Sequence, residues 1–362
     1  PQKGENLQQA ISREQLATRS SVGMLDASTL GKIDIQGRDA REFLGRVYTN
    51  AWAELQAGHC RYGLMCGEDG MVMDDGVTAC LSENHFLMST TTGGAAHVLS
   101  WLELYHQTEW PELDVFFNSV TDHWATIAIA GPDARRLLEP LVDIDISSDS
   151  FRFMQWRDAT VAGIPARVFR ISFTGELSFE INVPAHYGLF LWQTLYEAGK
   201  PFNLTPYGTE TMHVLRAEKG FIITGQDTDG SMTPYDINHG WAVANRKPFS
   251  FIGKRGMNRS DCLRKDRKQL VGLRTMDPKA ELPEGAQAVF NPNEAIPMSM
   301  VGHVTSSYYS ANLQRRIAMA VIKGGLQRMG ETVYFPLSDG QVIEAEICSS
   351  VFYDEKSLRQ KS

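Results

Sequence analysis

Two segments of the chain carry carboxylates whose neighbours suit them for chemistry. Asp74 and Asp75 follow an apolar run at 71–73, and an apolar setting raises the pKa of a carboxyl group toward values useful for accepting a proton. Glu180 lies in the alternating stretch 177–183, which places it on the face opposite its apolar neighbours. A buried carboxylate there can accept two adjacent N–H groups at once. Ordinary interpretations also remain open: a turn or strand end for the aspartates, and a solvent-facing position for Glu180.

Arg216, Tyr62 and Trp241 are the other candidates for a binding site. Arg216 lies near the end of an expected helix, where it either contacts a ligand or forms an ion pair with a nearby glutamate, Glu210 or Glu218. Tyr62 and Trp241 either line a cavity that holds a ring system or pack in the core. The residue types alone leave these choices open.

The elements that must position these side chains follow from the hydrophobic patterns. The patterns predict a β-hairpin around 67–70, helices at 38–50, from Gly94 onward, at 132–138, 186–198 and 207–218, and strands at 85–89, 125–130, 166–173, 177–183 and 240–243. From about Leu270 short apolar runs alternate with Gly, Pro, Asn and Asp. This change predicts a separate all-β C-terminal domain after the charged stretch at 264–268.

Composition and charge exclude several classes of function. The 362 residues are 43% hydrophobic and 22% charged, which is normal for a globular chain of two or three domains. A net charge of −8 argues against nucleic-acid binding. No apolar run approaches the ~18 residues that span a bilayer, so no membrane partner is expected. Five unpaired cysteines without a signal-like N-terminus favour free thiols and a cytoplasmic protein.

Several familiar chemical motifs are absent. No G-x-G-x-x-G follows a strand, so this chain is not expected to hold a dinucleotide. The histidines and cysteines do not have the spacing of a metal site, and no metal is expected. The chain opens on Pro1 rather than Met, so we expect it to begin inside a longer or processed polypeptide.

A set of motifs then follows in order along the chain. The segments are SVGMLDAS at 21–28, GMVMDD at 70–75, AGP at 130–132, SFTGE at 172–176 with FEI at 179–181, LRAEKG at 215–220, TP at 233–234 with GW at 240–241, FIGK at 251–254, GHVTS at 302–306 and RIAMA at 316–320. Together these segments resemble the glycine-cleavage T-protein (aminomethyltransferase) family over nearly the whole chain.

Finer features resemble one branch of that family. The segments at 28–32, 62–65, 90–94 and 213–222 are similar to the C-terminal half of the α subunits of heterotetrameric sarcosine oxidases. The resemblance implies that this half binds tetrahydrofolate, while FAD, FMN and NAD belong to other domains or subunits. It also implies a hetero-oligomer with the other sarcosine oxidase subunits.

The resemblance implies an α+β, three-domain, cloverleaf-like folate-binding aminomethyltransferase fold with a C-terminal antiparallel β-barrel or jelly-roll domain. The first α+β domain would comprise 1–52 and 126–238, and the second 53–125 and 239–268. The all-β domain would comprise 269–362. Folate would lie in the central channel.

The resemblance also implies roles for the candidate residues. Glu180 would accept the N3–H and the 2-amino group of the pterin, and Asp74 would be the catalytic carboxylate. Asp75, one residue on, should face the other way and is the alternative. Tyr62, Arg216 and Trp241 would complete the cofactor site.

This chain departs from the T-protein pattern at three positions. Phe173 replaces a tyrosine common in the family, so a hydroxyl contact is lost there. Met212 and His213 stand where T-proteins usually have Arg-Asp, which makes lipoyl-carrier chemistry less favoured.

The expected activity is transfer of a one-carbon unit from a sarcosine-derived imine to tetrahydrofolate, giving 5,10-methylenetetrahydrofolate. Two alternatives remain open: a stand-alone folate-dependent aminomethyltransferase or demethylase, and a non-catalytic folate-binding scaffold.

Overall fold

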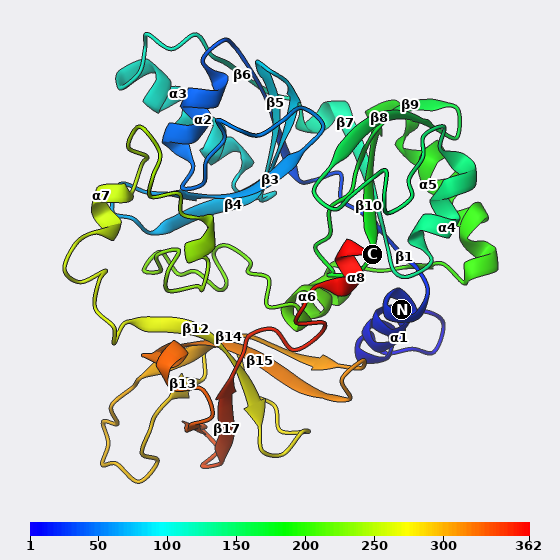
Figure 1. The fold of residues 1–362 in the computed structure, drawn as a ribbon. Coiled ribbons are helices and arrows are strands. Elements are labelled where there is room, and N and C mark those ends of the chain that lie inside the picture. Colours follow the sequence, from blue (N-terminus) through cyan, green and yellow to red (C-terminus); the bar gives the residue numbers. More distant parts are fainter.

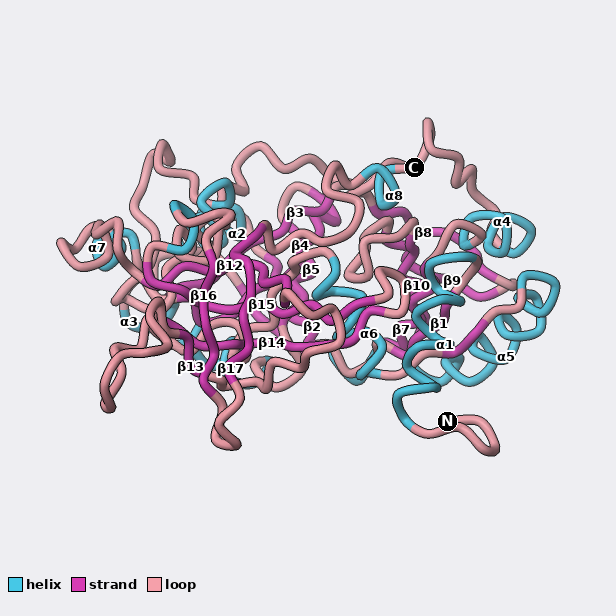
Figure 2. The backbone as a smooth tube through the Cα atoms, turned by 90° about the horizontal axis from the view of Figure 1, so that it is seen from below, coloured by secondary structure: helices cyan, strands magenta, loops and turns pink.

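The computed structural model describes residues 1–362 and contains three β-sheets, two of them flanked by helices (Figure 1). The barrel strands and the first sheet lie at opposite ends of the molecule when it is viewed from below (Figure 2). Each sheet has its own hydrophobic cluster. This arrangement confirms the predicted α+β class and the all-β C-terminal domain.

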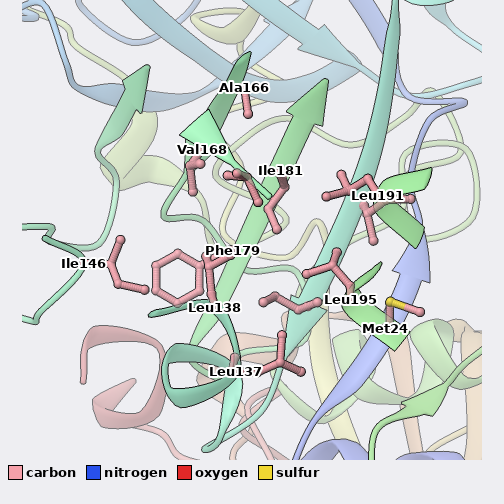
Figure 3. Packing of buried hydrophobic residues seen from close by; sticks show 14 of the residues in the cluster. Met24, Leu137, Leu138, Ile146, Ala166, Val168, Phe179, Ile181, Leu191 and Leu195 are labelled. Carbon is pink, nitrogen blue, oxygen red and sulfur yellow. The ribbon is translucent and has the colours of Figure 1, made fainter. Parts of the chain in front are cut away.

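The first sheet has the strand order β11-β1-β7-β10-β9-β8. Its elements are β1 (Gly23–Asp26), β7 (Trp124–Ala130), β8 (Trp156–Val161), β9 (Ile164–Phe169), β10 (Ser178–Pro184) and β11 (Thr205–Pro206), with helices α4 (Ala134–Leu138) and α5 (Gly188–Gly199). Leu138 of α4 and Leu191 and Leu195 of α5 pack on Phe179 and Ile181 of β10 (Figure 3). The helices therefore cover one face of this sheet and leave the other face, with Glu180, for a different partner.

The second sheet has the order β3-β4-β5-β2-β6 and repeats this plan. Its elements are β2 (Gly31–Gln36), β3 (Cys60–Cys66), β4 (Val72–Ser82), β5 (His85–Thr90) and β6 (Phe116–Ser119), with helices α2 (Ala40–Val47) and α3 (Ala95–Thr108). Phe43 of α2 and Val98 of α3 pack on Ile33, Ile35 and Met88. Its uncovered face meets that of the first sheet in a small apolar cluster containing Cys60, Ala79, Leu87, Trp156 and Phe169.

The third sheet is a nearly closed antiparallel barrel of order β13-β14-β15-β12-β17-β16. Its strands are β12 (Lys268–Thr275), β13 (Gln287–Ala288), β14 (Gly302–Ser310), β15 (Arg315–Lys323), β16 (Thr332–Pro336) and β17 (Val342–Cys348). A bridge between Val289 and Tyr334 links the two edges. Short helices α7 (Lys254–Met257) and α8 (Leu358–Lys361) precede and follow the barrel.

A buried ionic junction joins the first sheet's unit to the barrel. Arg19 of α1 (Leu7–Ser20) donates to Glu218 of α6 (Thr209–Glu218) at 2.6 Å and to Glu176 at 2.9 Å. Glu218 also accepts a hydrogen bond from Ser310 of the barrel. All four side chains are buried. The T-G-E and R-A-E segments of the sequence thus contribute to the junction between the domains.

Helix α1 was not predicted from the sequence. Its buried side chains include Gln15, Thr18 and Arg19, so no apolar stripe marks it. A capping box between Asn6 and Gln9 begins the helix.

One part of the expected domain division differs from the strand pairing. Residues 31–52 were expected in the first unit, but β2 pairs with β5 and β6 of the second sheet. The reason is that Ile33 and Ile35 complete the core under α2 and α3, a long-range contact that hydrophobic periodicity does not report. The remaining boundaries stay a prediction.

Candidate functional site

A hollow lies between the uncovered faces of the first and second sheets. Its polar lining consists of Lys32 and Ser89 from the second sheet and Thr126, Glu180 and Asn182 from the first. The hollow is narrow, with about 40 Å³ of room for the centres of water molecules. Two opposite charges, Lys32 and Glu180, therefore share one small and mostly apolar cavity.

Glu180 reaches this hollow because of strand alternation. On β10, Phe179 and Ile181 point into the helix-covered core (Figure 3), and Glu180 lies opposite Ala128 of β7 on the other face. No protein group donates a hydrogen bond to its carboxylate, and burial raises the pKa of Glu180 to about 7 against the lowering effect of Lys32. A half-buried carboxylate without a protein donor is unfavourable, and two adjacent N–H groups of a ligand would satisfy it.

Lys32 is buried on the opposite wall, with 4% of its surface exposed. Its Nζ donates to the carbonyl oxygens of Ser28 and Leu30, both at 3.0 Å. Burial lowers the pKa of Lys32, while Glu180 and, more weakly, Asp26 act to raise it. Sequence reasoning missed this residue. The signal was available in the alternation of Lys32 with two apolar strand residues, Ile33 and Ile35.

The two aspartates of β4 point to opposite faces of the second sheet. Asp75 lies across from Leu64 and on the same face as Val77, which lines the hollow. Its carboxylate accepts hydrogen bonds from the hydroxyl of Tyr62 at 2.8 Å and from that of Thr224 at 3.0 Å. Burial raises the pKa of Asp75, and the two hydroxyl donors oppose this rise.

Asp74 lies on the other face, beside the helices. It is 2% exposed and accepts hydrogen bonds from the backbone N–H of Asp75 at 2.8 Å and the hydroxyl of Thr91 at 3.1 Å. A Cβ at Gly94 would lie 2.3 Å from its Oδ2, so the carboxylate fits tightly against the turn that begins α3. Burial raises the pKa of Asp74 to about 6. Asp75 therefore lies on the side of the hollow and Asp74 on the helix side, while the catalytic role expected for Asp74 stays a prediction.

Tyr62 and Trp241 lie beside Asp75 in an aromatic cluster. The ring of Tyr62 is 5.7 Å from that of Trp241 and 5.9 Å from that of His239, measured between centroids. Trp241 is 68% exposed, so it is not a core residue. The expected strand at 240–243 is instead a 3-10 turn at Gly240–Ala242, which places the indole on the surface next to Tyr62.

Arg216 is not part of the hollow. Its guanidinium is wholly buried and pairs with Asp227, and it donates to Ser306 at 2.8 Å and Tyr308 at 3.2 Å. The expected partners, Glu210 and Glu218, are not the ones it uses. Arg216 therefore connects α6 to the barrel through its hydrogen bonds to Ser306 and Tyr308. No pattern in the sequence indicated Asp227 as its partner.

Tyr207 was also missed by the sequence analysis. Its ring is buried against Gly23, on the face of the first sheet that carries Glu180. Burial raises the pKa of the Tyr207 hydroxyl, and the Glu180 charge adds to this rise. Tyr207 is therefore a further polar group on this face.

Other features give no second candidate. A more open cleft at the barrel edge is lined by Arg274, Glu346 and Cys348, and it contains none of the predicted residues. No group of three or more His, Cys, Asp or Glu side chains is placed to hold a metal ion. No helix is both long enough and apolar enough to cross a membrane.

Comparisons with known proteins agree with this architecture. Residues 2–247 match the GCVT N-terminal domain, and residues 268–354 match the glycine cleavage T-protein C-terminal barrel domain. The crystal structure of the glycine cleavage system aminomethyltransferase T from Bartonella henselae superposes with a TM-score of 0.82 at 24% identity, covering 95% of this chain and 90% of that one. At this identity the similarity shows the fold.

Curated relatives fall into two groups. The sarcosine oxidase subunit alpha of Corynebacterium sp. (strain U-96) is 52% identical over 365 residues, and that of Rhizobium meliloti (strain 1021) is 42% identical over 363. Each alignment covers 99% of this chain, which spans only 37% of those relatives. The aminomethyltransferase of Alkaliphilus metalliredigens (strain QYMF) is 30% identical over 345 residues, 95% of this chain and 90% of that protein. The predicted resemblance is confirmed: the chain belongs to the glycine cleavage T-protein family, as an aminomethyltransferase-like domain related to sarcosine oxidase alpha subunits.

Proposed function

We propose that this chain holds a reduced folate in the hollow between its first two sheets and assists the transfer of a one-carbon unit onto it. The observation that carries the proposal is the carboxylate of Glu180, which is half-buried in the lining of the hollow and receives no hydrogen bond from the protein. Family membership supports the same ligand, since the domain is aminomethyltransferase-like.

The pterin edge suits this carboxylate. A reduced pterin presents its N3–H and 2-amino group side by side, and an ionised carboxylate can accept from both. Charge-assisted pairs of this kind are strong when water is excluded. Apolar side chains such as Phe169 and Val77 line the remainder of the hollow and suit the faces of the ring. Binding would thus satisfy the polar group that the fold leaves unpaired.

Asp75 is our candidate for the proton transfer. When a folate nitrogen attacks an iminium carbon, a C–N bond forms, the C=N electron pair moves to the amine nitrogen, and the folate nitrogen loses its proton. The carbon's bond to the original amine, now protonated, then breaks and the amine leaves. The second folate nitrogen attacks the same carbon and loses its proton, which closes the methylene bridge. A carboxylate nearby can accept that proton and stabilise the cationic iminium. Asp75 lies on the hollow side of β4, whereas Asp74 is held by Thr91 on the helix side. Asp74 serves as the matched comparison.

The source of the carbon would be a sarcosine-derived imine, formed by oxidation outside this chain. This part of the proposal rests on the sequence relation to sarcosine oxidase alpha subunits. Flavins and NAD would belong to other domains or subunits of a hetero-oligomer, and the product would be 5,10-methylenetetrahydrofolate. Tyr62 and Trp241, whose rings lie together near Asp75, would contact the folate there.

The test measures folate binding and carbon capture separately, in the intact protein that carries this chain. Glu180→Gln should weaken tetrahydrofolate binding by roughly 10- to 100-fold, the effect of losing a charged acceptor. Glu103→Gln, on the exposed side of α3, is the control. Unchanged binding by Glu180→Gln would refute the proposal.

Carbon capture is followed as methylenetetrahydrofolate formed per amine oxidised, because an uncaptured imine hydrolyses to free formaldehyde. Asp75→Asn should lower the capture rate by roughly 100-fold or more while folate binding persists, and Asp74→Asn should leave capture largely intact. If instead Asp74→Asn lowers the capture rate and Asp75→Asn does not, Asp74 is the residue that accepts the proton. Wild-type capture in both variants would favour a non-catalytic scaffold, and turnover of the amine by this chain alone would favour a stand-alone transferase.

A further inference from the structure

One charged side chain in the hollow has no role in the proposal so far. Lys32 is 96% buried, and of its three N–H groups two donate to the carbonyl oxygens of Ser28 and Leu30. No carboxylate lies within ion-pair distance of its Nζ, although Glu180 faces the same cavity and acts on it through space. One N–H donor of a buried ammonium is therefore left without a protein acceptor.

Burying a lysine in this way is unfavourable unless something uses the charge. An ammonium moved out of water loses strong hydration, and two backbone carbonyls replace only part of it. If position 32 served only to fill space, an apolar side chain would be more favourable there, like those of Leu30 and Val77, which also line the hollow. A buried cation and a half-buried carboxylate that line the same cavity therefore point to a polar ligand that contacts both.

The other polar groups in the hollow already have protein partners. The Ser89 hydroxyl donates to the Val77 carbonyl at 2.8 Å and accepts from the Val77 N–H at 3.0 Å. The Thr126 hydroxyl donates to Asn182 Oδ1 at 2.6 Å, which leaves the Asn182 amide N–H groups as the other available donors. Lys32 is the only cationic side chain lining the cavity.

We propose that Lys32 determines specificity in this hollow by donating its free N–H to the 4-oxo group of the pterin whose N3–H and 2-amino group Glu180 accepts. This inference rests on the proposed function. Along the pterin edge the 2-amino group, N3–H and C4=O are consecutive, in the order donor, donor, acceptor. The Glu180 carboxylate supplies two acceptors and the Lys32 ammonium supplies one donor, which is the complementary set.

The charge balance supports the same ligand. The pair Lys32 and Glu180 contributes +1 and −1, so the neutral edge of a 4-oxopterin leaves no net charge in the cavity. A 2,4-diaminopteridine presents an amino group where the oxo group would be. That group directs N–H donors at an ammonium that has only donors, so the pair would repel each other. Lys32 would thus distinguish 4-oxo from 4-amino ligands.

The test compares two ligands, tetrahydrofolate and its 4-amino analogue, by calorimetry on the intact protein. The wild type should prefer the 4-oxo ligand by roughly 10- to 100-fold, the range for one hydrogen bond to a charged group. Lys32→Met should lose most of its affinity for tetrahydrofolate and little for the analogue, so that the preference collapses. Lys32→Arg should retain part of it, and Lys279→Met, at an exposed barrel loop, should match the wild type.

The outcomes separate this inference from the proposed function. Two outcomes would show that Lys32 does not recognise the 4-oxo group. In the first, Glu180→Gln weakens tetrahydrofolate binding but Lys32→Met does not. In the second, Lys32→Met weakens the binding of both ligands equally. If Glu180→Gln has no effect, the folate proposal itself fails. If Lys32→Met does not fold, the affinities of the wild type and of Lys32→Arg for the two ligands provide the test. Equal affinity of the wild type for the 4-oxo and the 4-amino ligand would overturn the inference.

Discussion

Replacing Glu180 by glutamine should make the ligand-free protein more stable while it weakens folate binding. Burial raises the pKa of this carboxyl group to about 7 from an ordinary value of 4.5. Between these two values the folded protein keeps the proton and the unfolded chain gives it up. Stability therefore falls as the pH rises through this window. Glutamine has nearly the same size, cannot ionise and so avoids this loss.

The size of the effect follows from the two pKa values. One pKa unit corresponds to about 1.4 kcal/mol, so ionisable Glu180 lowers the free energy of unfolding by about 1 kcal/mol at pH 5 and about 3 kcal/mol at pH 8. Glu180→Gln should recover these amounts. The gain arises because the ligand-free fold holds the Glu180 carboxylate, partly removed from water, without a hydrogen-bond donor.

The assay is urea unfolding of the ligand-free protein at pH 5, 6.5 and 8, followed by fluorescence. The difference between variant and wild type should grow with pH. Saturating tetrahydrofolate should then reverse the order, because a ligand at 100 times its Kd stabilises the wild type by about 2.7 kcal/mol and the variant much less. Glu103→Gln should show neither effect. A variant that is less stable at every pH would mean that protein groups, rather than a ligand, satisfy the Glu180 carboxylate.

Three further predictions concern other parts of the molecule. Folate affinity should fall about tenfold between pH 8 and pH 6, since only ionised Glu180 accepts both pterin donors, and Glu180→Gln should remove that dependence in a calorimetric titration. Arg216→Met should lower the free energy of unfolding by about 3–5 kcal/mol, because it leaves Asp227 buried without its partner. The double variant Arg216→Met, Asp227→Leu should recover part of this loss. A loss below about 1 kcal/mol in the single variant would contradict the pairing. Asp74→Asn should loosen the turn before α3, seen as faster hydrogen exchange at Gly94, and unchanged exchange would refute this anchoring role.

Local pattern was sufficient for several parts of the site. Alternation in 177–183 separates Glu180 from Phe179 and Ile181 without any knowledge of the fold, because successive side chains of a strand point to opposite faces. The change of pattern near Leu270 likewise identified the β-rich C-terminal domain. Ordered motifs along the chain were enough to identify the family.

Alternation could not decide which aspartate faces the hollow. Both faces of β4 are covered, one by α2 and α3 and the other by the first sheet, so the chain carries no polar-against-apolar signal to separate Asp74 from Asp75. The choice depends on which layer packs on which face.

The partners of Lys32 and Arg216 also depend on tertiary contacts. Glu180 lies 148 residues after Lys32, and the two meet only because two separate sheets pack face to face. Arg216 pairs with Asp227 only where α6 meets the barrel, and β2 joins the second sheet through β5 and β6. The sequence alone determined the local elements, the faces of isolated strands and the family, because these depend on neighbouring residues. Only the tertiary structure determined which charges share a cavity, because those contacts join residues far apart in the chain.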